Sequence, residues 1–119
     1  MYDQRMRTLV ILGQAPLPDK LREVVERGST SIVEKRAADL AGRRLPVDVD
    51  RVVIWASAGD AEVATLAREY SRGASPEQRD SLIVVAPDSS APPPGVSPSE
   101  VFIWPGDEDR LKIAFMTGG

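Results

Sequence analysis

The stretch VFIWPGDEDRLKIAF, residues 101–115, joins a short apolar run directly to a helical pattern. Its first four residues are all apolar, and apolar side chains then recur from Leu111 to Phe115 at the spacing of one helix face. Between the two patterns stands the pair Trp104-Pro105, at a junction where α/β proteins usually keep their functional groups. The stretch therefore predicts a buried strand that leads into a helix.

Three other apolar runs share these features, namely TLVILG (8–13), RVVIWA (51–56) and SLIVVA (81–86). Each run is continuous and rich in valine or isoleucine, which indicates strands that are buried on both faces of a parallel sheet. Helical stripes separate the runs, at Leu21, Val24 and Val25, at Val33, Ala37, Leu40 and Ala41, and at Val63, Leu66, Ala67 and Tyr70. This alternation predicts one α/β domain over residues 1–119.

Residues 28–35, GSTSIVEK, fit two local structures. One is a short edge strand around Thr30–Val33, and the other is a helix start with Ser31 and Glu34 as a capping box. The strand is favoured, because Gly28 is typical of the position just after the end of a helix.

Residues 86–100, APDSSAPPPGVSPSE, interrupt the alternation with five prolines. The run of Pro92, Pro93 and Pro94 cannot lie inside a helix. A crossover between two parallel strands is required here and is usually helical. We expect an extended loop that replaces or shortens the fourth helix of the domain.

Composition excludes several kinds of chemistry. The chain has no cysteine and no histidine, which rules out disulfides, thiolate metal sites and a Ser-His-Asp triad. The net charge is −3 and no basic face is evident, which argues against a nucleic-acid partner. The polar start leads into only about six apolar residues, far fewer than the roughly 20 of a membrane span. No signal peptide is visible, so we expect a cytoplasmic protein that does not bind membranes.

The order of these patterns resembles the receiver domain of bacterial response regulators. The segment DRVVIW (50–55) is similar to the family's third strand, and LREVVERG (21–28) to its first helix. The segment IWPGDEDRL (103–111) is similar to its fifth strand, which carries a Lys-Pro pair before a loop and an acidic helix start. The resemblance covers nearly the whole chain. It implies a flavodoxin-like three-layer sandwich whose parallel sheet has the order 2-1-3-4-5.

Receiver chemistry depends on side chains at the carboxyl ends of the strands: an acidic pair that holds Mg²⁺, an aspartate that accepts the phosphoryl group, a hydroxyl and a lysine. The matching positions here are Leu12 and Gly13 for the acids, Trp55 (or Ala56 or Ser57 in a shifted register) for the acceptor, Ala86 for the hydroxyl, and Trp104, before Pro105, for the lysine. Mg²⁺ needs oxygen ligands, and a phosphoryl group needs positive charge or hydrogen-bond donors. We therefore expect no phosphotransfer, no metal, no cofactor and no enzymatic activity.

The resemblance without its chemistry predicts a pseudo-receiver that binds another protein, or a second copy of itself, without phosphorylation. The candidate partner surface consists of Pro92, Pro93, Pro94, Phe102, Arg110 and Lys112. The alternative is a Rossmann-like domain that binds a small ligand at the carboxyl edge of the sheet. The candidate ligand residues are Gln14, Ser57, Asp60 and Asp88.

Two further groups of residues allow a structural and a functional interpretation. Trp55 and Trp104 either pack into the core, which is favoured, or form a cage for a ligand. Asp107, Glu108 and Asp109 either complement the positive end of the last helix, which is favoured, or bind a metal.

Overall fold

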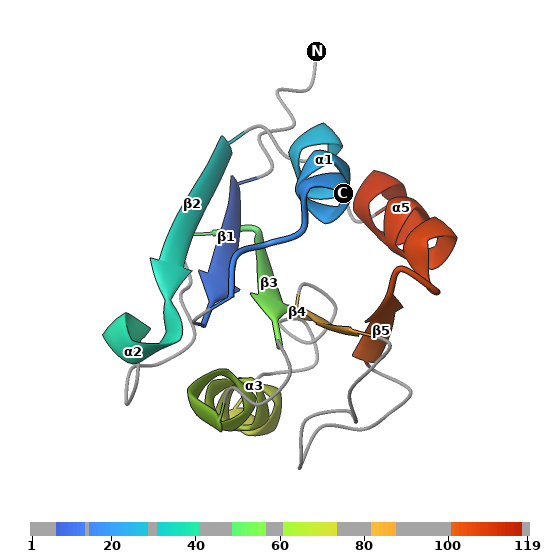
Figure 1. The fold of residues 1–119 in the computed structure, drawn as a ribbon. Coiled ribbons are helices and arrows are strands. Elements are labelled where there is room, and N and C mark those ends of the chain that lie inside the picture. Colours follow the sequence, from blue (N-terminus) through green and yellow to red (C-terminus); the bar gives the residue numbers. More distant parts are fainter. Residues whose placement is uncertain are drawn as a thin grey trace.

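The computed structural model describes residues 7–13, 15–28, 31–40, 49–56, 61–73, 82–87 and 101–117. The elements are β1 (Arg7–Leu12), α1 (Asp19–Arg27), β2 (Ser31–Arg36), α2 (Ala37–Leu40), β3 (Arg51–Trp55), α3 (Ala61–Gly73), β4 (Leu82–Pro87), β5 (Val101–Trp104) and α5 (Glu108–Thr117). The strands form one parallel sheet in the order β2-β1-β3-β4-β5, with helices on both faces (Figure 1). The expected flavodoxin-like α/β fold is therefore confirmed. No helix among the described residues is long and apolar enough to span a membrane.

Each face of the sheet buries its own apolar cluster, because successive residues of a strand point to opposite faces. On β3, Val53 and Trp55 face α1 and α5, whereas Val52 and Ile54 face α2 and α3. All five residues of β3 are buried, which explains why its sequence is continuously apolar after Arg51. Figure 1 shows α1 and α5 together on one side of the sheet and α3 on the other.

The two clusters are named here after their helices. The α1–α5 core consists of Val10, Leu17, Leu21, Val24, Val25, Val53, Trp55, Ile83, Val85, Trp104, Leu111 and Phe115. The α2–α3 core consists of Leu9, Ile11, Ala37, Leu40, Val52, Ile54, Ala56, Val63, Leu66, Ala67, Tyr70, Val84, Ala86 and Val101. The stripes predicted for the first, third and last helices supply buried residues to these cores, as expected.

The second predicted helical stripe is partly wrong. Val33 belongs to β2, where it is 49% exposed, and α2 contains only Ala37–Leu40. All six residues of β2 pair with β1 in parallel register, which confirms the edge strand favoured for this segment and extends it to Arg36. Pairing with a distant strand therefore determines the local structure here. The Pro-rich segment 88–100, where a loop was expected in place of a helix, lies outside the described residues.

The end of α1 packs closely against α5 at Gly28. A Cβ atom at position 28 would lie 2.7 Å from the Cβ of Phe115, closer than two non-bonded carbon atoms approach. The backbone of Gly28 has φ −91°, which any residue can adopt. Space, and not backbone conformation, therefore requires glycine at this position.

Arg51 lies beside this contact and is only 3% exposed. Its guanidinium donates hydrogen bonds to the carbonyl oxygens of Gly28 and Phe115, each at 3.3 Å, and lies 4.5 Å from the centroid of the Phe115 ring. Burial lowers the pKa of Arg51, and the carboxylate of Asp50 offsets part of that shift. The guanidinium stays charged at neutral pH, since the pKa of arginine lies far above 7. One buried cation thus joins the start of β3 to the last turns of α1 and α5.

We predict that Gly28→Ala destabilises the protein by about 1–3 kcal/mol, because the added methyl group forces α1 and α5 apart. Gly73→Ala is the matched control, because a Cβ atom at position 73 meets nothing within 4 Å. That control should be neutral or stabilising by up to about 1 kcal/mol. Urea unfolding of both variants and the parent measures the difference. Equal stability of the two variants would contradict the close packing of Gly28 on Phe115.

Candidate functional site

The carboxyl ends of the strands meet at one edge of the sheet, which is where open α/β proteins bind their ligands. The structure brings to this edge all the positions that match the receiver's reactive groups: Leu12, Gly13, Trp55, Ala86, Trp104 and Pro105. They stand at the ends of four adjacent strands, β1, β3, β4 and β5. Their spatial grouping follows directly from the parallel pairing.

Apolar side chains fill this edge at the ends of β3, β4 and β5. Trp55 and Trp104 are 5% and 7% exposed and both belong to the α1–α5 core. Ala86 is fully buried on the opposite face, in the α2–α3 core. The indole Nε1 of Trp55 has no hydrogen-bond partner anywhere in the described part of the chain. The burial of both rings in the α1–α5 core agrees with the core interpretation of the tryptophans.

The loop between β5 and α5 is closed by Asp107. Its backbone N–H donates to the carbonyl oxygen of Ile103 at 2.6 Å, and its carboxylate accepts a hydrogen bond from the N–H of Ile103 at 2.7 Å. The N–H of Glu108 donates to the carbonyl oxygen of Pro105 at 3.0 Å, and the Trp104–Pro105 peptide bond is cis. The Asp107 side chain thus fixes the turn that leads from the strand into the helix.

The acidic residues at the start of α5 are engaged locally. Asp107 also lies 3.4 Å from the guanidinium of Arg110, and Glu108 pairs with Lys112 at 3.0 Å. Within the described residues, no group of three or more aspartates or glutamates stands close enough to hold a metal ion. These contacts agree with the helix-start interpretation of Asp107 and Glu108.

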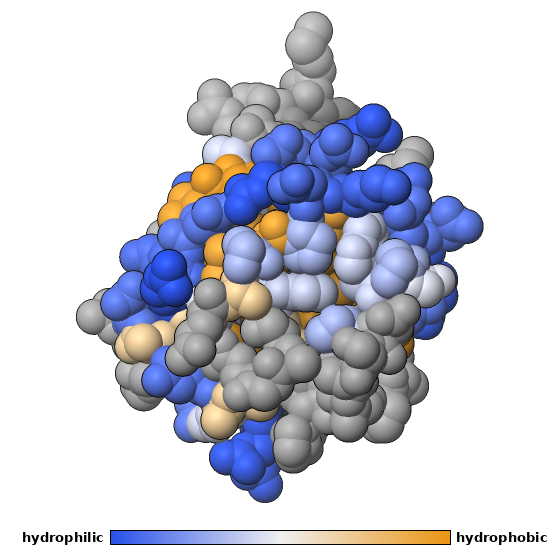
Figure 2. Space-filling model, in the orientation of Figure 1, coloured by the Kyte–Doolittle hydropathy of each residue, from blue (hydrophilic) through white to orange (hydrophobic). Residues whose placement is uncertain are grey.

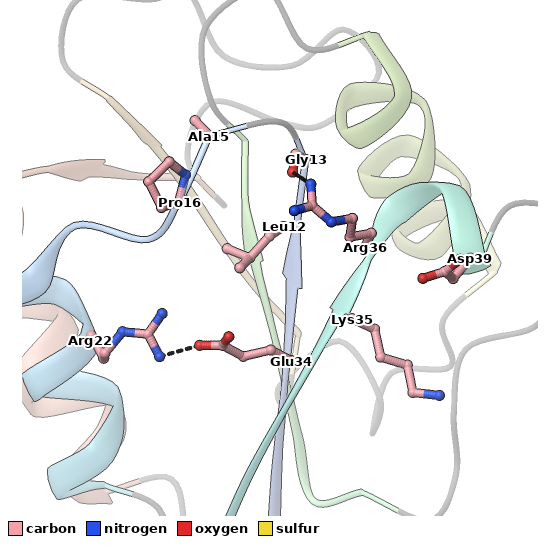
Figure 3. Close-up of a pocket in the computed structure, with 9 residues that line it drawn as sticks. All are labelled: Leu12, Gly13, Ala15, Pro16, Arg22, Glu34, Lys35, Arg36 and Asp39. Atoms are coloured by element: carbon pink, nitrogen blue, oxygen red, sulfur yellow. Dashed lines mark hydrogen bonds and ion pairs between the residues drawn. The ribbon is translucent and has the colours of Figure 1, made fainter.

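A hollow of about 850 Å³ opens at the same edge of the sheet, beside the end of β2. It is lined by Leu12, Gly13, Ala15, Pro16, Arg22, Glu34, Lys35, Arg36 and Asp39 (Figure 3). These residues come from the end of β1, the segment that follows it, α1, β2 and α2. Its volume is within the range of about 300–1,000 Å³ typical of small-molecule sites.

Two polar contacts fix the walls of this hollow. Arg22 on α1 forms an ion pair with Glu34 on β2, and the guanidinium of Arg36 donates to the carbonyl oxygen of Gly13 at 3.1 Å (Figure 3). Glu34 and Arg36 lie on the same face of β2, because alternate residues of a strand share a face. Lys35 projects from the other face of the strand, away from Arg22, as Figure 3 shows.

Two of the candidate partner residues, Phe102 on β5 and Arg110 on α5, form a small surface patch. The guanidinium of Arg110 lies over the half-buried ring of Phe102, 5.0 Å from its centroid. Ile113, one helical turn after Arg110, is 61% exposed. Lys112 lies about 160° around the helix axis from Arg110, on the side of Glu108. The structure therefore separates Lys112 from Phe102 and Arg110, and adds Ile113, which the sequence analysis did not select.

The remaining predicted site residues lie outside the part of the chain that the structure describes. They are Gln14, Ser57, Asp60 and Asp88 of the ligand hypothesis and Pro92, Pro93 and Pro94 of the partner hypothesis.

Of the residues that line the hollow, sequence reasoning selected Leu12 and Gly13 and missed the charged ones. The segment VEKR (33–36) carries the available signal, because two charged residues two positions apart, Glu34 and Arg36, share one face of a strand. That signal depends on the assignment of residues 31–36 as a strand along its full length. The ion pair with Arg22 follows only from the packing of α1 beside β2.

Comparison with known proteins identifies no relative of this chain. No protein-family model, no curated protein and no solved structure matches the chain.

We predict that Asp107→Ala lowers the free energy of unfolding by about 1–2 kcal/mol, because the N–H of Ile103 loses a charged acceptor. Asp107→Asn retains an acceptor oxygen and should lose less. Asp109→Ala is the control, because Asp109 is exposed two residues further along the same helix start, and should change stability by about 0.5 kcal/mol at most. Thermal unfolding of the three variants tests this, and equal losses for Asp107→Ala and Asp109→Ala would contradict the role of Asp107.

Proposed function

We propose that this chain is a pseudo-receiver, a protein–protein interaction module that acts in bacterial signalling or regulation without being phosphorylated. The observation that carries the proposal is the buried apolar filling of the sheet edge by Trp55, Ala86 and Trp104 within a flavodoxin-like fold. Receiver chemistry needs carboxylates, a hydroxyl and a lysine at these strand ends, as the resemblance implies. The fold is retained and the reactive groups are replaced, which favours a role in recognition.

The energetics of charge burial support the loss of phosphotransfer. Mg²⁺ and a phosphoryl group are strongly hydrated, and transferring them to an apolar surface without compensating partners is costly. Trp55 and Trp104 offer one indole N–H each and no oxygen ligand. Asp107, the nearest acid after β5 in sequence, already accepts the N–H of Ile103. The described groups at these strand ends thus have little capacity to stabilise the transferred charge.

The β5–α5 patch, defined as Phe102, Arg110 and Ile113, is the proposed contact surface. In the receiver family, the fourth helix, fifth strand and fifth helix form the usual partner face. Here an exposed aliphatic side chain lies one helical turn from an arginine stacked on an aromatic ring. Aromatic residues and arginine are enriched at interfaces, and a guanidinium already stacked on a ring loses less conformational freedom on binding. The partner is therefore expected to be a protein with an apolar recess and an acidic rim.

A phosphodonor assay tests the loss of chemistry. After incubation with acetyl phosphate and Mg²⁺, we expect the intact mass of the chain to remain unchanged, because the described end of β3, up to Ala56, carries no acceptor carboxylate. A response-regulator receiver with its acceptor aspartate, treated in parallel, provides the positive control. A gain of one phosphoryl group that hydroxylamine removes would show an acyl phosphate and overturn the proposal.

Paired affinity capture tests the contact surface. Proteins from cell extract that bind the parent chain should be lost when Ile113 is changed in Ile113→Ser, and retained with Arg68→Gln on α3. Both side chains are exposed, so either change should alter stability by about 0.5 kcal/mol or less. If every protein captured by the parent is captured equally by Ile113→Ser, the β5–α5 patch is not the contact surface.

A further inference from the structure

We propose that the hollow beside β2 is a binding site for a small molecule that carries a carboxylate or phosphate group. This inference is independent of the pseudo-receiver role and of the β5–α5 patch. It rests on the position of the hollow in the sheet, on the charged residues that line it, and on the hydrogen-bond donors that Arg36 presents.

The hollow lies where the topology favours a ligand. The chain leaves β1 at Leu12, passes Gly13, Ala15 and Pro16 along the rim, and enters α1. From β1 the next strand, β2, is added on one side and β3 is added on the other, so the order reverses at β1. Clefts outside the carboxyl ends of strands at such a reversal are the common ligand sites of open α/β sheets.

The charge of the lining selects an anion. Five of the lining residues are ionisable, of which three are cationic (Arg22, Lys35 and Arg36) and two are anionic (Glu34 and Asp39). The lining has a net charge of +1 only with Lys35 counted, and Lys35 projects from the other face of β2 (Figure 3). On the face that meets α1, Glu34 pairs with Arg22, and Arg36 forms an ion pair with none of the described carboxylates. Most small-molecule pockets are lined mainly by apolar groups, so a lining this rich in charge favours a charged ligand.

Arg36 is the group placed to receive the anion. Its side chain points from the end of β2 toward the segment that follows β1 (Figure 3). One guanidinium nitrogen, Nη1, donates a hydrogen bond to the carbonyl oxygen of Gly13 in that segment. A guanidinium has five N–H donors in a planar fork that matches the oxygens of carboxylate and phosphate. The bond to Gly13 orients that fork and leaves other donors available, since the described residues offer Arg36 no second acceptor.

Glu34 and Arg22 set the affinity of the site. Their ion pair lies on the same side of β2 as Arg36, and each side chain is 37% exposed. The carboxylate of Glu34 neutralises Arg22 and repels an incoming anion. Removing this carboxylate should free the Arg22 guanidinium for the ligand, while Leu12, Ala15 and Pro16 offer an apolar wall to the ligand's body.

A titration followed by two-dimensional ¹H–¹⁵N NMR tests the proposal on the intact chain. The probes are sodium phosphate and sodium succinate, with sodium chloride at matched ionic strength as the reference. We expect one or both oxyanions, and not chloride, to shift the signals of Gly13 and of the Arg36 side chain with a Kd of about 1 mM or tighter. The two probes distinguish a phosphate ligand from a carboxylate ligand.

Three variants make the test specific to the hollow. Arg36→Gln should weaken binding about tenfold, because it removes the bidentate donor. Glu34→Gln should tighten it several-fold, a gain that a misfolded protein cannot produce. Arg68→Gln on α3 changes the net charge as Arg36→Gln does and should leave the Kd unchanged. Absence of shifts with both oxyanions, or equal binding by Arg36→Gln and the parent, would overturn the proposal, whereas phosphotransfer and partner capture test the pseudo-receiver role separately.

Discussion

The packing of α1 and α5 on the sheet depends on the contact of Arg51 with the last turns of these two helices. A buried guanidinium is costly unless its donors are satisfied, and here the carbonyl oxygens of Gly28 and Phe115 accept them. Both oxygens lie at carboxyl ends of helices, where the helix dipole is negative, so the cation stabilises the two helix ends together. The Phe115 ring adds a cation–π contact. Because Gly28 has no side chain, α1 approaches α5 closely enough for one arginine to reach both. This anchor at the amino edge fixes the helices that cover Trp55 and Trp104 at the opposite edge.

The two edges of the sheet therefore differ in kind. At the described amino edge, the charge of Arg51 is buried with the carbonyl oxygens that accept its hydrogen bonds. At the carboxyl edge, the ends of β3, β4 and β5 are apolar and belong to the core. Figure 2 shows mainly hydrophilic residues over α1 and α5, the two helices that pack on Trp55 and Trp104. Tryptophan is well suited to such filling, because one indole covers a large area in a fixed orientation. Among the described residues the Nε1 of Trp55 has no acceptor, so these residues position the ring by packing and not by a hydrogen bond.

Much of this fold was predictable from the sequence, because runs such as residues 51–56 are long, continuous and separated by clear helical stripes. The order of the strands came from the resemblance to receivers and is confirmed by the pairing. Val33 was placed wrongly because its spacing to Ala37 fits a helix, while its strand conformation is imposed by pairing with Leu9, which lies far away in sequence. The hollow was not predicted for a related reason. Its walls are joined by the ion pair between Arg22 on α1 and Glu34 on β2. A local sequence pattern does not predict which of the many charged residues form such a pair.

The charged residues on β2 have a second possible role besides ligand binding, and the contacts of each residue distinguish the two roles. β2 is an edge strand of the sheet, and charged side chains on edge strands oppose pairing with other chains. That role needs only that the charges be exposed, and Lys35 meets it. Glu34 and Arg36 do more, because one pairs with α1 and the other holds the carbonyl of Gly13. Together the two contacts join β2 to α1 and to the segment that follows β1, and so fix the walls of the hollow before any ligand arrives. A site whose donors are already oriented loses less entropy on binding, which makes Arg36 effective as a receptor for an anion even though it is exposed.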